Sequence, residues 1–297
     1  MATAFCPAHI TGFFKAELNK EDSKQLGSLG AGFSIQKGVK TTVTIRNKTK
    51  HDISNFTITV NGFESGDMRV SEVVLSKFPT KEKFVDVIHE IDVPVGYGFG
   101  SSAAVALSLS IALNDALECK LSKIKVAQIA HDVEIECKTG LGDVLASYHG
   151  GFEIRDKPGA PGIGHVQKIA LNEISIIMIC FSPISTSKFI KERLPQINGL
   201  GGKMVNKLLE SKNYEHFQEM SLEFAKYVDV MTPRMQKVVN ELSKNNIKCG
   251  IALFGETIFS MIPKEKENKV LEILKKYSDG IIIKSELDDV GARVLHN

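Results

Sequence analysis

The feature that most constrains this chain is a glycine-rich segment, Pro94-Val-Gly-Tyr-Gly-Phe-Gly-Ser-Ser-Ala-Ala104, followed directly by alanine- and leucine-rich sequence. Its three glycines let the backbone turn tightly and approach a ligand closely. Residues 101 to about 117 favour helix, and the free amides at a helix start attract anions. The segment predicts a phosphate-binding turn that leads into a helix. The simpler alternative is a glycine turn in which Ser101 only caps a core helix.

Two better-known phosphate loops fit this chain poorly. A P-loop requires Gly-Lys-Ser/Thr, and Gly202-Lys203-Met204 lacks the hydroxyl residue. Residues 98–103 satisfy the dinucleotide pattern GxGxxG/A, but that fold places a second strand after the helix. Here the sequence from Ser122 to Lys138 predicts another helix, with Ser122 as its N-cap.

Two carboxylates follow the glycine segment in the chain. Glu134 lies in the second predicted helix, and Asp143 lies in the turn Thr139-Gly-Leu-Gly-Asp143. In phosphoryl transfer one carboxylate can hold a metal ion while another receives or orients the substrate hydroxyl. The alternatives are a solvated helix position for Glu134 and simple helix capping for Asp143.

Three further residues are candidates for binding an anionic substrate. Arg155 follows the pair Gly150-Gly151, and its guanidinium can grip a carboxylate through two hydrogen bonds. Ser28 lies in Gly27-Ser-Leu-Gly-Ala-Gly32, which we interpret as a small-residue loop. His131 precedes Glu134 by one helical turn. A surface salt bridge for Arg155 and a structural role for His131 are the alternatives.

The remaining sequence indicates two halves. Alternating apolar and polar residues predict strands at 41–45, 56–60 and 84–88. Proline and glycine at 158–164 mark a loop, near which we place a boundary between domains 1–160 and 161–297. The second half predicts the order β-α-β-β-α-β of ferredoxin-like domains, with the first helical region beginning near Lys203.

Composition limits the partners of the chain. The net charge of the 297 residues is +2, without a basic run that would indicate a nucleic-acid or membrane surface. The five cysteines are scattered with no CxxC pair, so we expect neither disulfides nor a zinc site. Without a signal peptide or long apolar run, we expect a cytoplasmic protein with small-molecule partners, no nucleic acid and no membrane.

In chain order, these pieces resemble the GHMP kinases, the superfamily of galactokinase, homoserine kinase and mevalonate kinase. Residues 94–104 look like their phosphate motif, with Phe99 where leucine is usual. Cys6-Pro-Ala-His-Ile-Thr-Gly12 is similar to the first family motif and Cys249-Gly-Ile-Ala-Leu-Phe-Gly-Glu-Thr257 to the third. Many members carry Lys or Arg at the position of His9, so we assign His9 no catalytic role.

The resemblance implies an α+β fold of two α/β halves, an N-terminal ribosomal-protein-S5-like half and a C-terminal ferredoxin-like half. It implies that ATP is held by the glycine segment, through Pro94, Gly96, Gly98, Gly100, Ser101, Ser102 and Ala103. It also implies Mg²⁺ on Ser102 and Glu134, and the acceptor hydroxyl on Asp143. Ser102, Glu134 and Asp143 form the expected catalytic set. A homodimer is one assembly consistent with this family.

The likeness extends to the archaeal members that phosphorylate pantoate, through residues 4–12, 27–32 and 139–144. It implies ATP-dependent phosphorylation of pantoate in coenzyme A biosynthesis, with Ser28, His131 and Arg155 as substrate contacts. The alternatives are a GHMP kinase for mevalonate, homoserine or a sugar, and a nucleotide-binding module without turnover.

Overall fold

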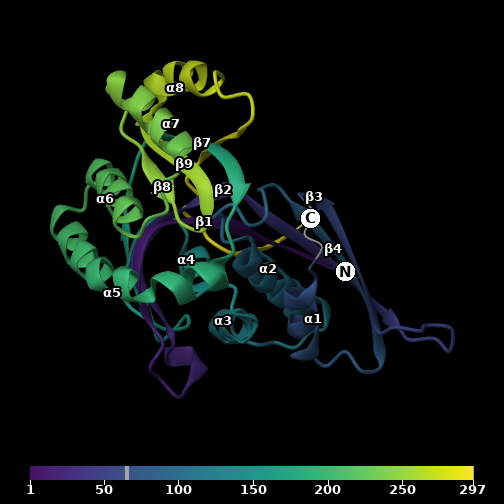
Figure 1. The fold of residues 1–297 in the computed structure, drawn as a ribbon. Coiled ribbons are helices and arrows are strands. Elements are labelled where there is room, and N and C mark those ends of the chain that lie inside the picture. The colour runs from purple at the N-terminus through teal and green to yellow at the C-terminus, as the bar shows by residue number, and fades with distance from the viewer. Residues whose placement is uncertain (64–66, 297) are drawn as a thin grey trace.

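The computed structural model describes residues 1–63 and 67–296, and two β-sheets organise it (Figure 1). The large sheet consists of β1 (Ala2–Glu17), β2 (Gly27–Asn47), β3 (Phe56–Gly62), β4 (Lys83–Ile91), β5 (Phe152–Lys157), β6 (His165–Ile169) and β11 (Arg293–Leu295). The small sheet consists of β7 (Ile174–Pro183), β8 (Gly250–Ala252), β9 (Gly255–Pro263) and β10 (Ile281–Glu286). The helices are α1 (Arg69–Ser76), α2 (Ser101–Ala116), α3 (Lys123–Cys137), α4 (Asp143–His149), α5 (Thr186–Ser211), α6 (Tyr214–Tyr227), α7 (Pro233–Lys244) and α8 (Glu267–Leu274).

The large sheet has the order β11-β1-β2-β4-β3, with β5 paired to β2 and β6 paired to β5. Helices α1 to α4 gather on one side of it, and α2 contacts both β1 and β2 (Figure 1). Ala103, Ala104 and Leu107 are fully buried in α2. An alanine- and leucine-rich helix without a polar face suits this position, because sheet and helices enclose it.

The small sheet has the antiparallel order β10-β7-β9-β8, with α5 to α7 between β7 and β8 and α8 between β9 and β10. The predicted order β-α-β-β-α-β and the two-part α+β class are therefore confirmed. The predicted loop at 158–164 joins β5 to β6 within the large sheet. The chain passes to the small sheet after β6, and the domain boundary near residue 160 stays a prediction.

Strand β7 separates two apolar cores. Ile176, Met178 and Cys180 belong to the main core, while Ile177 and Ile179 belong to a second core under α7 and α8. This division follows from the pleat, because successive side chains of a strand point to opposite faces. The main core also contains side chains of β1 and β2, so it joins the two sheets.

Two sequence predictions about local structure are wrong. Residues 27–32 form the start of β2, not a loop, and pair with β1 on one side and in part with β5 on the other. Backbone pairing on two sides overrides the weak strand propensity of glycine. Helix α5 begins at Thr186, well before the predicted start near Lys203, and continues through Pro195. Packing against β1 supports this helix despite the proline.

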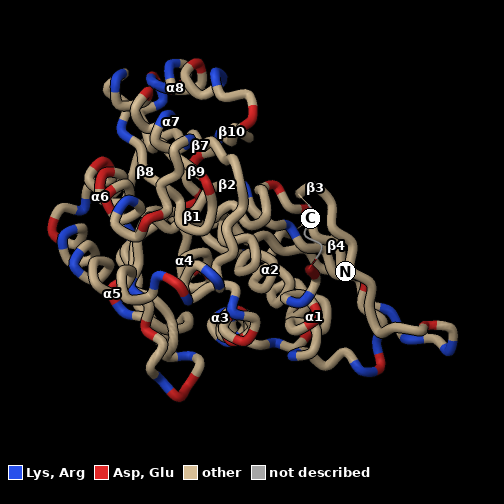
Figure 2. Tube along the Cα trace, in the orientation of Figure 1, with Lys and Arg blue, Asp and Glu red and all other residues tan. Residues whose placement is uncertain are grey.

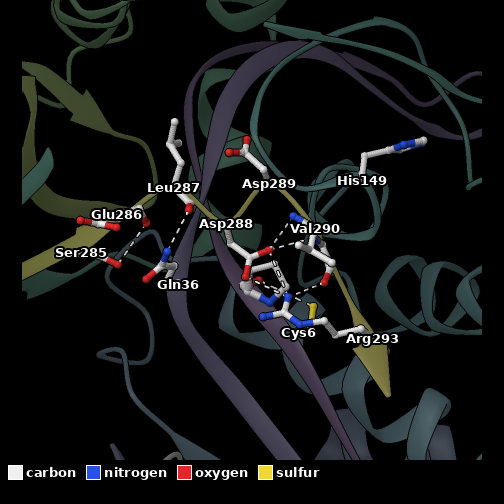
Figure 3. A network of polar contacts seen from close by, with 12 residues as sticks. Cys6, Gln36, His149, Ser285, Glu286, Leu287, Asp288, Asp289, Val290 and Arg293 are labelled. Carbon is white, nitrogen blue, oxygen red and sulfur yellow. Dashed lines mark hydrogen bonds and ion pairs between the residues drawn. The ribbon is translucent and has the colours of Figure 1, made fainter. Parts of the chain in front are cut away.

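A C-terminal segment returns from the small sheet to the large one (Figure 3). The backbone N–H of Asp288 donates to the Ser34 carbonyl at 3.0 Å, and its own carbonyl accepts from the Gly151 N–H at 2.7 Å. The Asp288 carboxylate accepts from Arg293 Nη1 at 2.9 Å. Strand β11 then pairs with β1, so this segment ties both sheets together.

Charges of both signs are spread along the described trace (Figure 2). Blue and red segments alternate on the outer helices α5, α6 and α8. Within residues 1–63 and 67–296, we find no helix that combines the length and apolarity needed to cross a membrane.

Buried His89 should make stability depend on pH. Thr41 Oγ1 and Ser71 Oγ lie 2.8 and 3.0 Å from its ring nitrogens, and burial lowers its pKa from 6.5 to about 4. As the pH falls below 6.5, the His89 imidazole takes up a proton in the unfolded chain. In the folded protein the same ring takes up a proton only near pH 4. The free energy of unfolding should therefore fall between these pH values, by about 3 kcal/mol from this group.

Urea unfolding at pH 7 and pH 4.5 checks this expectation when His89→Asn is compared with the unchanged protein. The variant should lose less stability on acidification, because it lacks the depressed histidine. An equal loss in both proteins would show that His89 does not contribute.

Candidate active site

The glycine segment between β4 and α2 has backbone angles that favour glycine. Gly96, Gly98 and Gly100 have φ of +84°, +86° and +57°. A Cβ at position 98 would also collide with the carbonyl oxygen of Leu253. Gly100 is the N-cap of α2 and supplies no side-chain hydrogen bond. The first amides of α2 therefore remain available to an anion.

The two other motif segments brace this loop. The N–H of His9 donates to the Phe99 carbonyl at 3.0 Å, and the hydroxyl of Thr257 donates to the Tyr97 carbonyl at 2.8 Å. The N–H of Leu253 donates to the Thr11 carbonyl at 3.0 Å, which links the two bracing segments. Segments that lie far apart in the sequence thus hold one turn in place.

A cavity of about 390 Å³ lies in front of the loop. Its wall includes the loop glycines, Ser101, Ser102, Glu134 and Asp143. The structure thus brings both predicted carboxylates to the predicted phosphate loop. Arg69 and Lys138 supply basic side chains to the same wall.

The two carboxylates have environments that shift their pKa values in opposite directions. Burial raises the pKa of Glu134, and the charge of Asp143 raises it further. Burial also acts to raise the pKa of Asp143, but a hydrogen bond from His9 and the charges of His9 and Arg155 bring it below its ordinary value. Without a cation, these shifts favour an ionised Asp143 and disfavour a second negative charge on Glu134, whereas a bound cation would favour the ionised form of Glu134. Asp143 is the first residue of α4 and not its cap.

A buried chain of charged groups extends from Asp143, and the sequence analysis missed two of its members. His9 Nδ1 lies 2.8 Å from Asp143 Oδ1, and His9 Nε2 lies 2.8 Å from Glu153 Oε1. Arg155 Nη1 donates to the same Glu153 oxygen at 2.6 Å. Because an ionised carboxylate only accepts, this pairing favours the imidazolium form of His9, in which both ring nitrogens donate. Burial opposes this charge, but both carboxylates raise the pKa of His9.

Signals for these two residues were present in the sequence. His9 lies in the segment Cys6-Pro-Ala-His-Ile-Thr-Gly12, whose resemblance to the first family motif implies a basic residue at this position in many members. Glu153 and Arg155 lie two apart in the sequence, and side chains at this spacing share one face when the segment is a strand. Neither signal shows by itself that His9 contacts both Asp143 and Glu153.

A second, much smaller cavity of about 10 Å³ lies beyond Asp143. Its wall includes Thr11, Ser28, Gly142, Asp143 and Arg155. The Nε atom of Arg155 is buried and has no hydrogen-bond partner among the described residues. An unpaired guanidinium N–H beside a hydroxyl is suited to bind a carboxylate.

His131 lies apart from these groups. Its Nε2 atom donates to the Ser23 carbonyl at 3.1 Å, and burial lowers its pKa. His131 does not belong to the wall of either cavity. Its predicted contact with the substrate therefore stays a prediction.

The residues of the larger cavity fit a magnesium ion. Glu134 Oε2 is buried without a hydrogen-bond partner among the described residues, and the Ser102 hydroxyl belongs to the same wall. Mg²⁺ commonly takes one or two carboxylates together with phosphate oxygens and water. In the described parts of the chain, no group of three or more His, Cys, Asp or Glu side chains could hold a metal. Phosphate oxygens would therefore have to complete the shell.

Comparison with known proteins gives a family match for the part of the chain that carries the loop and both carboxylates. The profile of the GHMP kinases N terminal domain matches residues 68–151. A pantoate kinase from Methanocaldococcus jannaschii is 34% identical over 277 residues, which cover 91% of this chain and 96% of that protein.

Solved structures show the same fold. A phosphotransferase related to the CoA biosynthesis pathway superposes with a TM-score of 0.88 at 28% identity, covering 98% of this chain and 97% of that chain. The protein MDDEF, solved in complex with MVAPP, AMPPCP and magnesium, superposes with a TM-score of 0.71 at 15% identity. That match covers 100% of this chain and 99% of the other, and it shows likeness of fold alone.

Gly98→Ala should destabilise the loop. The new methyl group meets a backbone carbonyl, and the φ of +86° strains any L residue, so the free energy of unfolding should fall by about 1–3 kcal/mol. Urea unfolding measures this change. Gly199→Ala in α5 is the matched control, since its Cβ meets only the Tyr227 hydroxyl at 3.3 Å. Equal stability of both variants would contradict the strained geometry of the loop.

Proposed function

The chain belongs to the pantoate kinase family of the GHMP kinases, and we propose that it transfers the terminal phosphoryl group of ATP to the primary hydroxyl of pantoate. Asp143 carries this proposal, because it lies in the wall of both cavities. The larger cavity offers the anion-binding loop, and the smaller offers the unpaired Nε of Arg155. A hydroxy acid bound across Asp143 would have its hydroxyl near the loop and its carboxylate near Arg155.

Arg155 and Ser28 would bind the carboxylate of pantoate. Arg155 is 1% exposed, so a hydrogen bond from it is little weakened by water. The smaller cavity of about 10 Å³ is too small for pantoate as it stands. Binding of the acceptor would therefore require residues of its wall to move, and the apolar ones are Phe14, Leu141, Ile190 and Phe254.

Asp143 would act on the acceptor hydroxyl. The hydroxyl oxygen of pantoate forms a bond to the γ-phosphorus, and the bond from that phosphorus to the bridging oxygen of ADP breaks. The hydroxyl proton passes to Asp143, whose ionised state His9 maintains through the 2.8 Å hydrogen bond. In such transfers positioning and charge neutralisation supply most of the rate enhancement.

The loop and the metal ligands would hold the nucleotide. The free amides at the start of α2 would face the phosphates, and Ser102 and Glu134 would hold Mg²⁺. The ion neutralises phosphate charge when it is bound. Lys138 and Arg69 add positive charge to the same cavity wall.

A phosphate-transfer assay tests the proposed function directly. ADP release is measured with ATP and Mg²⁺ in the presence of pantoate, mevalonate or homoserine. Release should depend on pantoate and remain near background with the other two. Faster release with another alcohol would assign a different acceptor, and nucleotide binding without release would indicate a binding module.

Asp143→Asn should lower kcat by about 10²- to 10⁴-fold, because the amide cannot accept the hydroxyl proton. The KM for ATP should change little, since the glycine loop remains intact. Steady-state kinetics measure both constants. Asp279→Asn, an exposed change on the small-sheet side of the molecule, is the control. Turnover near normal in Asp143→Asn would remove Asp143 from this role.

Arg155→Lys should raise the KM for pantoate selectively, by roughly 10- to 100-fold, because an ammonium group lacks the guanidinium fork. The retained charge still neutralises Glu153, so the fold should persist. Arg234→Lys, a partly exposed change in α7, is the control. An unchanged dependence on pantoate would assign the carboxylate to another site.

A further inference from the structure

Glu153 of β5 connects two parts of the site that the proposed reaction uses differently. Its Oε1 atom accepts from His9 Nε2 at 2.8 Å and from Arg155 Nη1 at 2.6 Å. His9 also donates to Asp143, which would act on the hydroxyl. Arg155 borders the small cavity that would receive the carboxylate. One carboxylate oxygen therefore joins the hydroxyl side of the acceptor site to its anion side.

This connection lies in the interior of the protein. The side chains of His9 and Glu153 are 0% exposed, and that of Arg155 is 1% exposed. Buried ions cost free energy unless they are paired and hydrogen-bonded, and apolar side chains of similar volume often stabilise a core as well. The charges of Asp143, His9, Glu153 and Arg155 cancel as a set. Packing alone would not require such a set at this place.

Strand β2, which pairs with β5, leaves room for the hydrogen-bonded side chains of His9, Glu153 and Arg155. In the register of β2 and β5, Gly32 pairs with Glu153 and Gly30 pairs with Arg155. A Cβ at Gly32 would lie 2.5 Å from His9 Nε2, and one at Gly30 would lie 2.6 Å from Arg155 Nη2. Any larger residue at these two positions would displace His9 or Arg155. The glycines of β2 thus leave space for the charged side chains, and they do not form a turn.

We propose that Glu153 is a positioning residue that couples recognition of the acceptor carboxylate to orientation of the acceptor hydroxyl. It acts through two arms, one through His9 to Asp143 and one through Arg155 to the substrate anion. This inference rests on the proposed function. It adds that a change at Glu153 disturbs both arms at once. Glu153 itself does not contact the acceptor.

A purely structural role for Glu153 has different kinetic consequences. If Glu153 served only folding, its loss would reduce the fraction of active protein. That reduction lowers the apparent kcat but leaves the KM for pantoate unchanged. A simultaneous change in kcat and in the KM for pantoate, with the KM for ATP constant, is specific to the coupling role.

Glu153→Gln is the main test, because glutamine keeps the size of the side chain and removes its charge. We expect kcat to fall and the KM for pantoate to rise, each by roughly 10- to 100-fold, since small displacements of positioned groups have effects of this size. The KM for ATP should stay within about 2-fold, because the glycine loop does not contact Glu153.

Single-arm variants separate the two effects. His9→Gln should mainly lower kcat, and Arg155→Lys should mainly raise the KM for pantoate. Glu153→Asp keeps the charge, and it provides the test if Glu153→Gln does not fold. The shorter side chain cannot reach both partners equally, so both constants should change in the same directions by smaller factors. Glu241→Gln, which only removes an exposed ion pair with Lys276, is the control.

The unchanged protein is assayed first, so failure of the proposed function is recognised separately. If it releases no ADP with pantoate, the proposed function is wrong. If it does, paired changes of kcat and pantoate KM in the Glu153 variants support the coupling. A change in only one constant, or in the unfolding midpoint alone, would overturn it.

Discussion

The buried hydrogen bonds from Asp143 through His9 and Glu153 to Arg155 are the interaction on which the site depends. These residues come from α4, β1 and β5, so their pairing fixes three elements of the fold relative to one another. Removing one partner of a buried ion pair typically costs about 3–5 kcal/mol, because an uncompensated charge remains. Removal of any one member therefore destabilises the arrangement.

The glycines around this set make it geometrically feasible. Gly30 and Gly32 leave space beside Arg155 and His9. A Cβ at Gly140 would collide with the Glu134 carboxylate. Backbone without side chains thus surrounds the charged groups, which brings two carboxylates, a histidine and an arginine into a small volume without excluding a ligand.

The glycine loop is held from both sheets, and this has a consequence for function. The first motif on β1 bonds to Phe99, and the Thr257 hydroxyl on β9 donates to the Tyr97 carbonyl. The same β1 strand carries His9, which positions Asp143. Movement of the phosphate site relative to the acceptor site is therefore restricted, as phosphoryl transfer between two bound substrates requires.

The sequence by itself determined the glycine turn with its helix, the Ser122 cap, the ferredoxin-like order of the second half and the family. These features depend on local propensity, periodicity and motif order, all of which a linear chain displays. The prediction of a loop at residues 27–32 is wrong. Glycine-rich sequence favours a turn, but here β1 and β5 supply backbone hydrogen bonds that hold these residues in a strand. Only the tertiary structure decided that His9 meets Asp143 and Glu153, which lie 134 and 144 positions away. Contacts at such separation depend on strand order and register, and the partners that favour the charged forms of His9 and Asp143 against burial come together only once the chain has folded.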